Sequence, residues 1–349
     1  MGARPYQNQL GFPNDQRAPR SPAPADDGTR RELLLAGATL ALGFAACGGE
    51  DEPPPARAST RTVRDAYGPV RVPAAPERVV AVDRGAADIA LAVGITPAGV
   101  ADEVREFPYL ARRLEDVPRT GPPDAPDLER ILGLRPDLIL GLDAYLEESE
   151  AYAQLSKIAP TFAARFGAGA TSREFSEDLA RGLGREAELG RVVDAYEAKV
   201  AKLRADLGER RGATVSILRV DPAGGSDHML YLAGMFCGNV VYNDVGLGVP
   251  PQLRKAVGDP RTAWTDLERE TLLEISREQF RLAETDDIFV WSFSDDTEAD
   301  LVARVVEDPL FRRLDAVQAG RVHTFGTHWI QETVTGASMI LDDLRSALL

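Results

Sequence analysis

Between residues 186 and 207, apolar side chains recur every three or four positions and charged side chains fill the positions between them. This spacing predicts a single long amphipathic helix. Its apolar positions are Leu189, Val192, Val193, Tyr196, Val200, Leu203 and Leu207. At about 1.5 Å per residue the helix is roughly 33 Å long, enough to cross between two lobes and to limit how far they swing.

On both sides of this helix, short apolar runs alternate with helical patterns. Before it, we predict a hairpin over 63–72, strands at 78–82, 98–100, 138–140 and 160–163, and helices at 86–93, at the start of 128–137, and at 144–157. After it, we predict strands at 215–220, 229–232, 287–293 and 321–325, and helical stretches at 236–243, 271–283, 298–306 and 333–348. Strand and helix in alternation favour parallel sheets.

One short segment occurs twice, once in each half of the chain. Residues 128–140 and 277–290 each read as a helix, a turn and a buried strand, and Glu129 and Glu278 stand at equivalent places near the two helix starts. The repeat indicates two similar lobes, 62–185 and 209–349, joined by a helix at 186–208. The predicted fold class is therefore α/β, with two Rossmann-like lobes and a ligand cleft between them, where clefts between domains are favoured sites.

The N-terminal segment carries the pattern of a processed leader. Arg30 and Arg31 form a twin-arginine pair ahead of the apolar run 33–46, which is shorter than the roughly 20 residues that a membrane-spanning helix needs. Small residues then precede Cys47, as in a bacterial lipobox. We expect a signal peptide over 1–46, lipidation of Cys47 and a Pro-rich tether over 47–61.

The composition and charge of the chain limit the classes of protein to which it can belong. The chain has 349 residues, 44% hydrophobic and 27% charged, with a net charge of −15. The acidity argues against binding the phosphate backbone of nucleic acids. The chain has two cysteines, Cys47 and Cys237, and therefore no CxxC pair. We interpret Cys237 as a small buried apolar residue.

Six segments occur in the order typical of one family: 76–80, 92–100, 127–141, 155–161, 275–279 and 319–323. Over residues 62–348 the chain resembles the periplasmic binding proteins of iron-siderophore and cobalamin importers. The resemblance implies two lobes joined by a rigid helix, a shallow cleft for a metal chelate, and delivery to the permease dimer of an ABC importer. It implies no enzymatic activity and no cofactor, because the ligand is a ferric chelate.

The same resemblance gives the two glutamates a role. In that family a glutamate on each lobe docks onto arginines of the permease, and Glu129 and Glu278 match those positions. A carboxylate near a helix start is favoured by the helix dipole and stays ionised for an arginine partner. The alternative is that both are ordinary acids of helix N-termini.

Candidate ligand contacts are cations and aromatic residues near strand ends, where α/β sheets bind ligands. Arg219 matches a position where siderophore-binding relatives often carry a cation, and Arg84 stands at the equivalent point of the first lobe. The candidate aromatic residues are Tyr109, Tyr231, Trp291 and Trp329. Arg219 has an alternative role in a surface salt bridge, and each aromatic residue has an alternative place in the core.

The histidines allow a metal-binding alternative. A receptor for bare metal would bring several histidines and carboxylates together, and His323 with His328 can form part of such a set, with His228 elsewhere. We expect no direct metal ligation, because His323 falls within a predicted strand. The nearest rival function is cobalamin or haem binding; a tethered metal-dependent hydrolase and a structural cell-wall module are further alternatives. The sequence thus predicts a monomeric lipoprotein at the outer face of the cytoplasmic membrane that binds a ferric siderophore.

Overall fold

The computed structural model describes residues 59–147, 150–166, 171–220, 227–232, 236–257, 272–292, 299–330 and 332–349. The predicted signal peptide and Cys47 lie outside the described residues. In the described ranges, no helix combines the length and the apolar character needed to cross a membrane.

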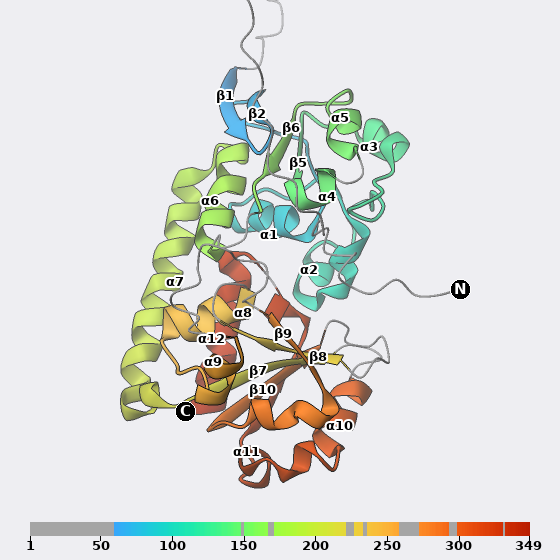
Figure 1. Ribbon diagram of the computed structural model, residues 1–349. Helices are drawn as coiled ribbons and strands as arrows, with labels where there is room; N and C mark the ends of the chain where they lie inside the picture. The colour runs from blue at the N-terminus through green and yellow to red at the C-terminus, as the bar shows by residue number, and fades with distance from the viewer. Residues whose placement is uncertain are drawn as a thin grey trace, which may run out of the picture. The chain divides into compact units, whose positions relative to one another are not determined.

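The first lobe is built on a four-stranded parallel sheet with the strand order β4-β3-β5-β6. Figure 1 labels β5 and β6 of this sheet. Its strands are β3 (Val79–Ala81), β4 (Gly99–Val100), β5 (Leu138–Leu142) and β6 (Thr161–Ala164). Every residue of these strands is buried, which matches a parallel sheet covered on both faces. An antiparallel hairpin, β1 (Thr60–Asp65) and β2 (Gly68–Pro73), packs near β6.

Helices surround this sheet. They are α1 (Arg84–Ala92), the 3₁₀ helix η2 (Asp102–Glu106), α2 (Pro108–Arg113), α3 (Leu128–Leu134), α4 (Asp143–Glu147), α5 (Ala151–Leu155) and α6 (Ser172–Leu183). The start of α6 is fixed by a capping box in which Thr171 and Glu174 each bond the other's backbone N–H.

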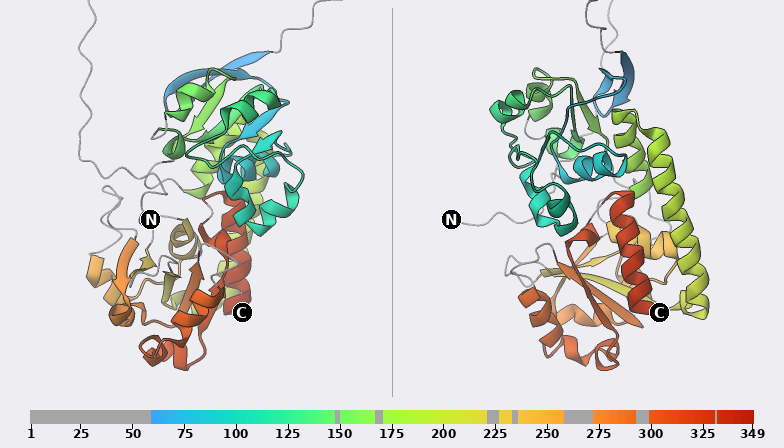
Figure 2. Two further views of the ribbon diagram at one scale, coloured as in Figure 1. Left: turned by 90° about the vertical axis from the view of Figure 1, so that its right-hand side faces the viewer. Right: turned by 180° about the vertical axis from the view of Figure 1, so that it is seen from behind.

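Helix α7 (Glu186–Leu207) confirms the predicted long helix. Its buried face consists of Leu189, Val193, Tyr196, Val200, Leu203 and Leu207, which are six of the seven predicted apolar positions. It packs against α6 of the first lobe and against α12 (Val334–Leu348) and η4 (Asn239–Val245) of the second. Figure 2 shows α7 and α12 side by side.

The second lobe contains a five-stranded sheet with the order β11-β10-β7-β8-β9. Its strands are β7 (Val215–Val220), β8 (Asp227–Tyr231), β9 (Leu272–Ser276), β10 (Asp287–Ser292) and β11 (Val322–Phe325). Strands β7, β10 and β11 are parallel, whereas β8 and β9 add on as antiparallel strands. This sheet is therefore mixed rather than wholly parallel.

The helices of the second lobe include one π-helical segment, η4 (Asn239–Val245), which continues from α8 (Phe236–Gly238). The others are η3 (Gly208–Gly212), α9 (Pro251–Val257), η5 (Arg277–Ala283), α10 (Ala299–Glu307), η6 (Phe311–Arg313), α11 (Asp315–Gln318), η7 (Thr327–Ile330) and α12. Cys237 is fully buried, as predicted.

Two helix predictions are wrong. Residues 272–276, predicted as helical, form strand β9 because they pair with β8, and the helix begins only at Arg277, after its cap at Ser276. The single helix predicted over 144–157 is two short helices, α4 and α5. The repeat itself is confirmed: α3 precedes β5 and η5 precedes β10, although η5 is a 3₁₀ helix.

Candidate functional site

Three predicted ligand residues come together in the second lobe: Arg219, Tyr231 and Trp291. The guanidinium Nη1 of Arg219 donates to the Tyr231 hydroxyl at 3.1 Å, and the Arg219 Cζ lies 5.9 Å from the centre of the Tyr231 ring. The rings of Tyr231 and Trp291 are 5.4 Å apart. We call this set the Arg219 cluster; each member is at most 1% exposed.

Sheet register explains why these residues meet. Arg219 on β7 is directly opposite Trp291 on β10, so both side chains stand on one face of the sheet. Tyr231 is opposite Ile217, two residues from Arg219 and therefore on that same face. Arg219 and Trp291 are each the penultimate residue of a parallel strand. The cluster thus lies at the carboxyl ends of β7 and β10, where α/β sheets bind ligands.

Arg84 lies in the first lobe and is the first residue of α1, just after β3. The preceding Asp83 caps this helix: its Oδ1 accepts from the Ala86 N–H at 2.8 Å, while its Oδ2 accepts from the Leu142 N–H of β5 at 2.7 Å. Asp83 therefore fixes the position of α1 on the sheet, and with it the position of the arginine.

Arg84 is 6% exposed, and carboxylates from both lobes hold its side chain. Its Nη1 lies 3.0 Å from Glu103 on η2 and donates to the Tyr145 hydroxyl on α4 at 2.8 Å. Its Nη2 lies 3.1 Å from Oε2 of Glu332, which precedes α12 in the second lobe. The guanidinium also lies over the Phe107 ring. We call Arg84, Glu103, Tyr145 and Glu332 the Arg84 cluster.

Burial changes the acidity of the carboxyl groups around Arg84. Burial raises the pKa of Asp83 to about 7, helped by repulsion from Glu103 and Glu332 and opposed by the two N–H donors. Burial also raises the pKa of Asp88, on α1, to about 6 against hydrogen bonds from Thr333 and Tyr109. The pKa of Glu332 is likewise raised by burial, despite the opposing charge of Arg84. Asp83 and Asp88 therefore take up protons in the range near neutrality.

The remaining two candidate aromatic residues lie apart from the Arg219 cluster. Tyr109, half-buried on α2, bonds to Asp88 and so joins the surroundings of α1. Trp329 is fully buried; its indole stacks on Phe325 at 4.4 Å and donates to Asp343 on α12 at 2.7 Å. Its surroundings are those of a core residue, and its role in ligand binding stays a prediction.

Glu129 and Glu278 are both exposed and are each the second residue of their helices, α3 and η5. The pKa of Glu278 is lowered, chiefly by a hydrogen bond with Ser276 at the helix cap. Leu132, one turn after Glu129 on α3, is 59% exposed. Both carboxylates are therefore available to a partner.

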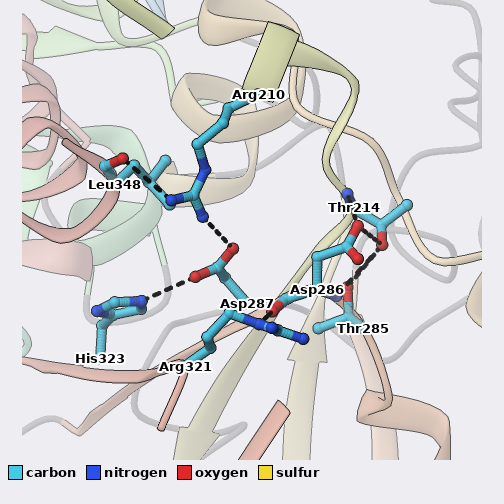
Figure 3. Close-up of polar contacts among 8 residues, drawn as sticks. All are labelled: Arg210, Thr214, Thr285, Asp286, Asp287, Arg321, His323 and Leu348. Carbon is cyan, nitrogen blue, oxygen red and sulfur yellow. Dashed lines mark hydrogen bonds and ion pairs between the residues drawn. The ribbon is translucent and has the colours of Figure 1, made fainter. Parts of the chain in front are cut away.

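Each histidine has its own neighbours. His323 lies on β11, as predicted, with Nε2 3.0 Å from the Asp287 carboxylate, which Arg210 also contacts at 2.9 Å (Figure 3). His328 pairs with Asp343, and His228 stacks on Phe280. Within the described ranges, no group of three or more His, Cys, Asp or Glu side chains is arranged to hold a metal ion.

Figure 3 also shows the polar contacts at the amino ends of the second-lobe strands. Arg210, just after α7, donates to the carbonyl of Leu348 as well as to Asp287. The Asp286 carboxylate accepts from the Thr214 N–H at 2.8 Å. This network joins the end of α7 to the sheet and to the C-terminus, at the edge opposite the Arg219 cluster.

A groove of about 360 Å³ runs along α7 between the start of α6 and η4. Its lining includes Tyr196 and Asp244, which are joined by a hydrogen bond of 2.5 Å. None of the six predicted ligand residues lines it. The groove is therefore separate from both clusters.

Sequence reasoning missed Asp83, Glu103 and Glu332. An aspartate directly before an apolar helical run is a recognisable helix cap, so the pattern at Asp83 could have been found. Nothing local marks Glu103 or Glu332, which reach Arg84 from 19 and 248 positions away.

Known proteins match both the sequence and the fold. The family of periplasmic binding proteins matches residues 79–327. The achromobactin-binding periplasmic protein of Dickeya dadantii is 30% identical over 287 residues, covering 77% of this chain and 85% of that protein. A Bacillus subtilis protein, the putative ABC transporter substrate-binding lipoprotein YhfQ, is 25% identical over 327 residues, covering 90% and 97%.

The structure of Staphylococcus aureus SirA complexed with staphyloferrin B superposes with a TM-score of 0.66 and 25% sequence identity, covering 83% of this chain and 98% of that one. The fold predicted from the sequence, two α/β lobes joined by one long helix, is thereby confirmed. These relatives are binding proteins and not enzymes. The chain belongs to the periplasmic binding protein family.

Proposed function

We propose that this protein binds a ferric siderophore between its lobes and delivers it to the permease of an ABC importer. The observation that carries the proposal is the Arg219 cluster: a cation and an indole at the carboxyl ends of parallel strands, with the Tyr231 ring of an antiparallel strand on the same face. The names of the relatives, which include achromobactin-binding and Fe(3+)-hydroxamate-binding proteins, support this ligand class.

The chemistry of the cluster suits such a ligand. Siderophores bind iron through hydroxamate, carboxylate or catecholate oxygens, and an arginine donates a fork of hydrogen bonds to oxygens of this kind. Aromatic side chains next to the cation suit the apolar parts of a large chelate. The domain limits that we propose are those expected from the sequence, with lobes at 62–185 and 209–349 and the connecting helix at 186–208.

Delivery requires a docking surface, which we assign to Glu129 and Glu278. Each is exposed at the start of a helix in a different lobe, and together they give one carboxylate per lobe for a permease dimer. We further propose that Cys47 carries a lipid and holds a monomer at the outer face of the cytoplasmic membrane. The name of the related YhfQ, a putative ABC transporter substrate-binding lipoprotein, supports this assignment.

Arg219→Ala tests the ligand site. Loss of a hydrogen bond to a charged group costs roughly 1.5–3 kcal/mol, or about 10- to 150-fold in affinity. We expect this loss in tryptophan-fluorescence titrations against a panel of ferric siderophores, haem and cobalamin. Arg312→Ala, which removes an exposed arginine of the same lobe, is the matched control.

The panel also separates the alternatives. Binding of haem or cobalamin alone would assign the nearest rival function. Unchanged affinity of Arg219→Ala for a confirmed ferric ligand would show that the Arg219 cluster is not the binding site.

The docking assignment needs a separate measurement. Glu129→Ala combined with Glu278→Ala should leave ligand affinity intact but abolish uptake in cells, with milder effects of the single changes. Normal transport by the double variant would show that both residues are ordinary acids of helix N-termini with no docking role.

A further inference from the structure

Three consecutive residues of the second lobe, Glu332, Thr333 and Val334, contact the first lobe. Glu332 pairs with Arg84 on α1, and the Thr333 hydroxyl donates to the Asp88 carboxylate on the same helix. The Val334 N–H donates to the Ser176 hydroxyl of α6 at 2.9 Å. All three second-lobe residues are buried. We call this three-residue contact the latch.

Negative charge exceeds positive charge around the latch. Helix α1 and its N-cap face the latch with Asp83, Arg84 and Asp88. Helix η2 faces it with Glu103, and Glu332 belongs to the latch itself. The further titratable neighbours are Tyr145 on α4 and Tyr109 and Arg113 on α2, whereas α6 and α12 contribute the hydroxyls of Ser176 and Thr333. Among the described residues, four carboxyl groups thus lie around the latch; Arg84 pairs with two of them, Glu103 and Glu332, and Arg113 acts on Asp88 as a weaker second cation.

Within the described ranges, these carboxyl groups are not arranged to hold a metal ion. Glu332 also has one carboxylate oxygen, Oε1, that is buried and makes no hydrogen bond with any described residue. Oε1 lies against Gly85, where an added Cβ would approach it to 3.1 Å. An ionised carboxylate with a buried, unbonded oxygen is unfavourable, whereas a protonated one is much less so.

We propose that the latch is a proton-binding site between the lobes, closed when the carboxyl groups around Arg84 hold a proton and loosened when they hold none. The raised pKa values of Asp83, Asp88 and Glu332 agree with this geometry. The inference concerns the protein without its ligand and goes beyond siderophore delivery.

The sign follows from linkage. Separation of the lobes exposes Glu332 to water and returns its pKa towards the ordinary glutamate value, so the closed state binds more protons than the open state. Closure is therefore favoured at low pH and is lost as the pH rises through the raised pKa values. The ratio of closed to open molecules falls by up to about tenfold per pH unit for each proton released.

Distances between spin labels on the two lobes of the ligand-free protein measure this ratio. Lys157→Cys in the first lobe and Gln318→Cys in the second give exposed labelling sites, since Cys237 is buried and Cys47→Ser removes the other thiol. We expect one narrow distance distribution at about pH 5.5 and a second, longer component that grows towards about pH 8.

Glu332→Gln is the decisive variant, because glutamine imitates the protonated side chain with little change in shape. It should stay closed across the whole range and so reduce the pH response. Thr333→Val, which removes the donor to Asp88, should be more open at every pH but keep the response. Glu307→Gln, at an exposed glutamate of α10, should behave as the unsubstituted protein does.

Two results would overturn the proposal: distance distributions of the unsubstituted protein that do not change with pH, or a pH response that Glu332→Gln retains in full. The first of these needs no variant, so poor folding of Glu332→Gln cannot leave the question open. Because no siderophore is present, either result leaves the proposed function standing.

Discussion

Asp83→Asn offers a test of how the first lobe is held together. The Asp83 side chain is fully buried, and its two oxygens accept from two different N–H groups, those of Ala86 and Leu142. Asparagine keeps one acceptor oxygen but turns its amide NH2 towards the other N–H donor. The variant therefore loses one hydrogen bond and buries an unsatisfied donor, which together destabilise by about 1–3 kcal/mol.

The pH dependence of this loss follows from the pKa of Asp83, about 7 in the folded protein against 3.8 as its ordinary value. A raised folded-state pKa contributes stability that is complete below the unfolded pKa and is lost as the pH rises through the folded pKa. For this pair of pKa values the contribution falls by about 2 kcal/mol between about pH 5 and about pH 7. The asparagine of the variant cannot titrate, so the deficit of the variant should be largest at low pH.

Urea unfolding followed by circular dichroism, at intervals from about pH 5 to about pH 8, measures both free energies of unfolding. Asp127→Asn is the matched control: Asp127 caps α3 through the Arg130 N–H, but its side chain is 41% exposed. It reports the loss of a capping carboxylate without burial. A deficit of Asp83→Asn that stays constant over the range would refute the assignment of a titrating proton to Asp83.

Three further predictions concern other parts of the chain. Asp287→Ala should destabilise the protein by about 1–3 kcal/mol in the same unfolding assay. A hydrogen bond from His323 and the charge of Arg210 overcome the effect of burial and hold the pKa of Asp287 below its usual value. The destabilisation should therefore become smaller in acid, where the carboxylate is protonated. Gly182→Ala should destabilise the protein by about 1–3 kcal/mol, since its Cβ would lie 2.6 Å from a buried phenylalanine ring. Gly190→Ala on α7, where an added Cβ has nothing within 4 Å, should stabilise it by up to about 1 kcal/mol. Equal shifts in melting temperature for the two variants would contradict the packing argument. Cys47→Ala should move the protein from the membrane to the soluble fraction, a result that fractionation checks and that membrane retention would exclude.

The parts of the fold that were predictable are those with a strong local period. The positions of α7 were readable because its apolar residues recur over six turns of helix, and strands β3 and β5 because each is a continuous apolar run. Strand β9 was mistaken for helix, since its identity depends on pairing with β8 and not on its own five residues. Helix α6 was missed although Thr171 and Glu174 form a recognisable capping box before it.

In the candidate site, too, residues near strand ends were predictable and contacts between distant segments were not. Arg219, Tyr231 and Trp291 could be proposed from their places near strand ends, because strand register brings such residues together. Arg84 was also found from its place after a strand, but its partners were not. Glu332 reaches it from the other lobe, and a contact between distant segments leaves no periodic signal in the sequence.

The hydrophobic core has a consequence for how the protein unfolds. One continuous cluster of buried apolar side chains includes Leu140 and Phe162 of the first sheet, Val200 of α7, and Phe289 of the second sheet. Because both lobes pack on α7 within this one cluster, the unfolding of either lobe uncovers part of that helix. The two lobes should therefore melt together, and scanning calorimetry should record a single heat-absorption peak whose calorimetric and van't Hoff enthalpies agree.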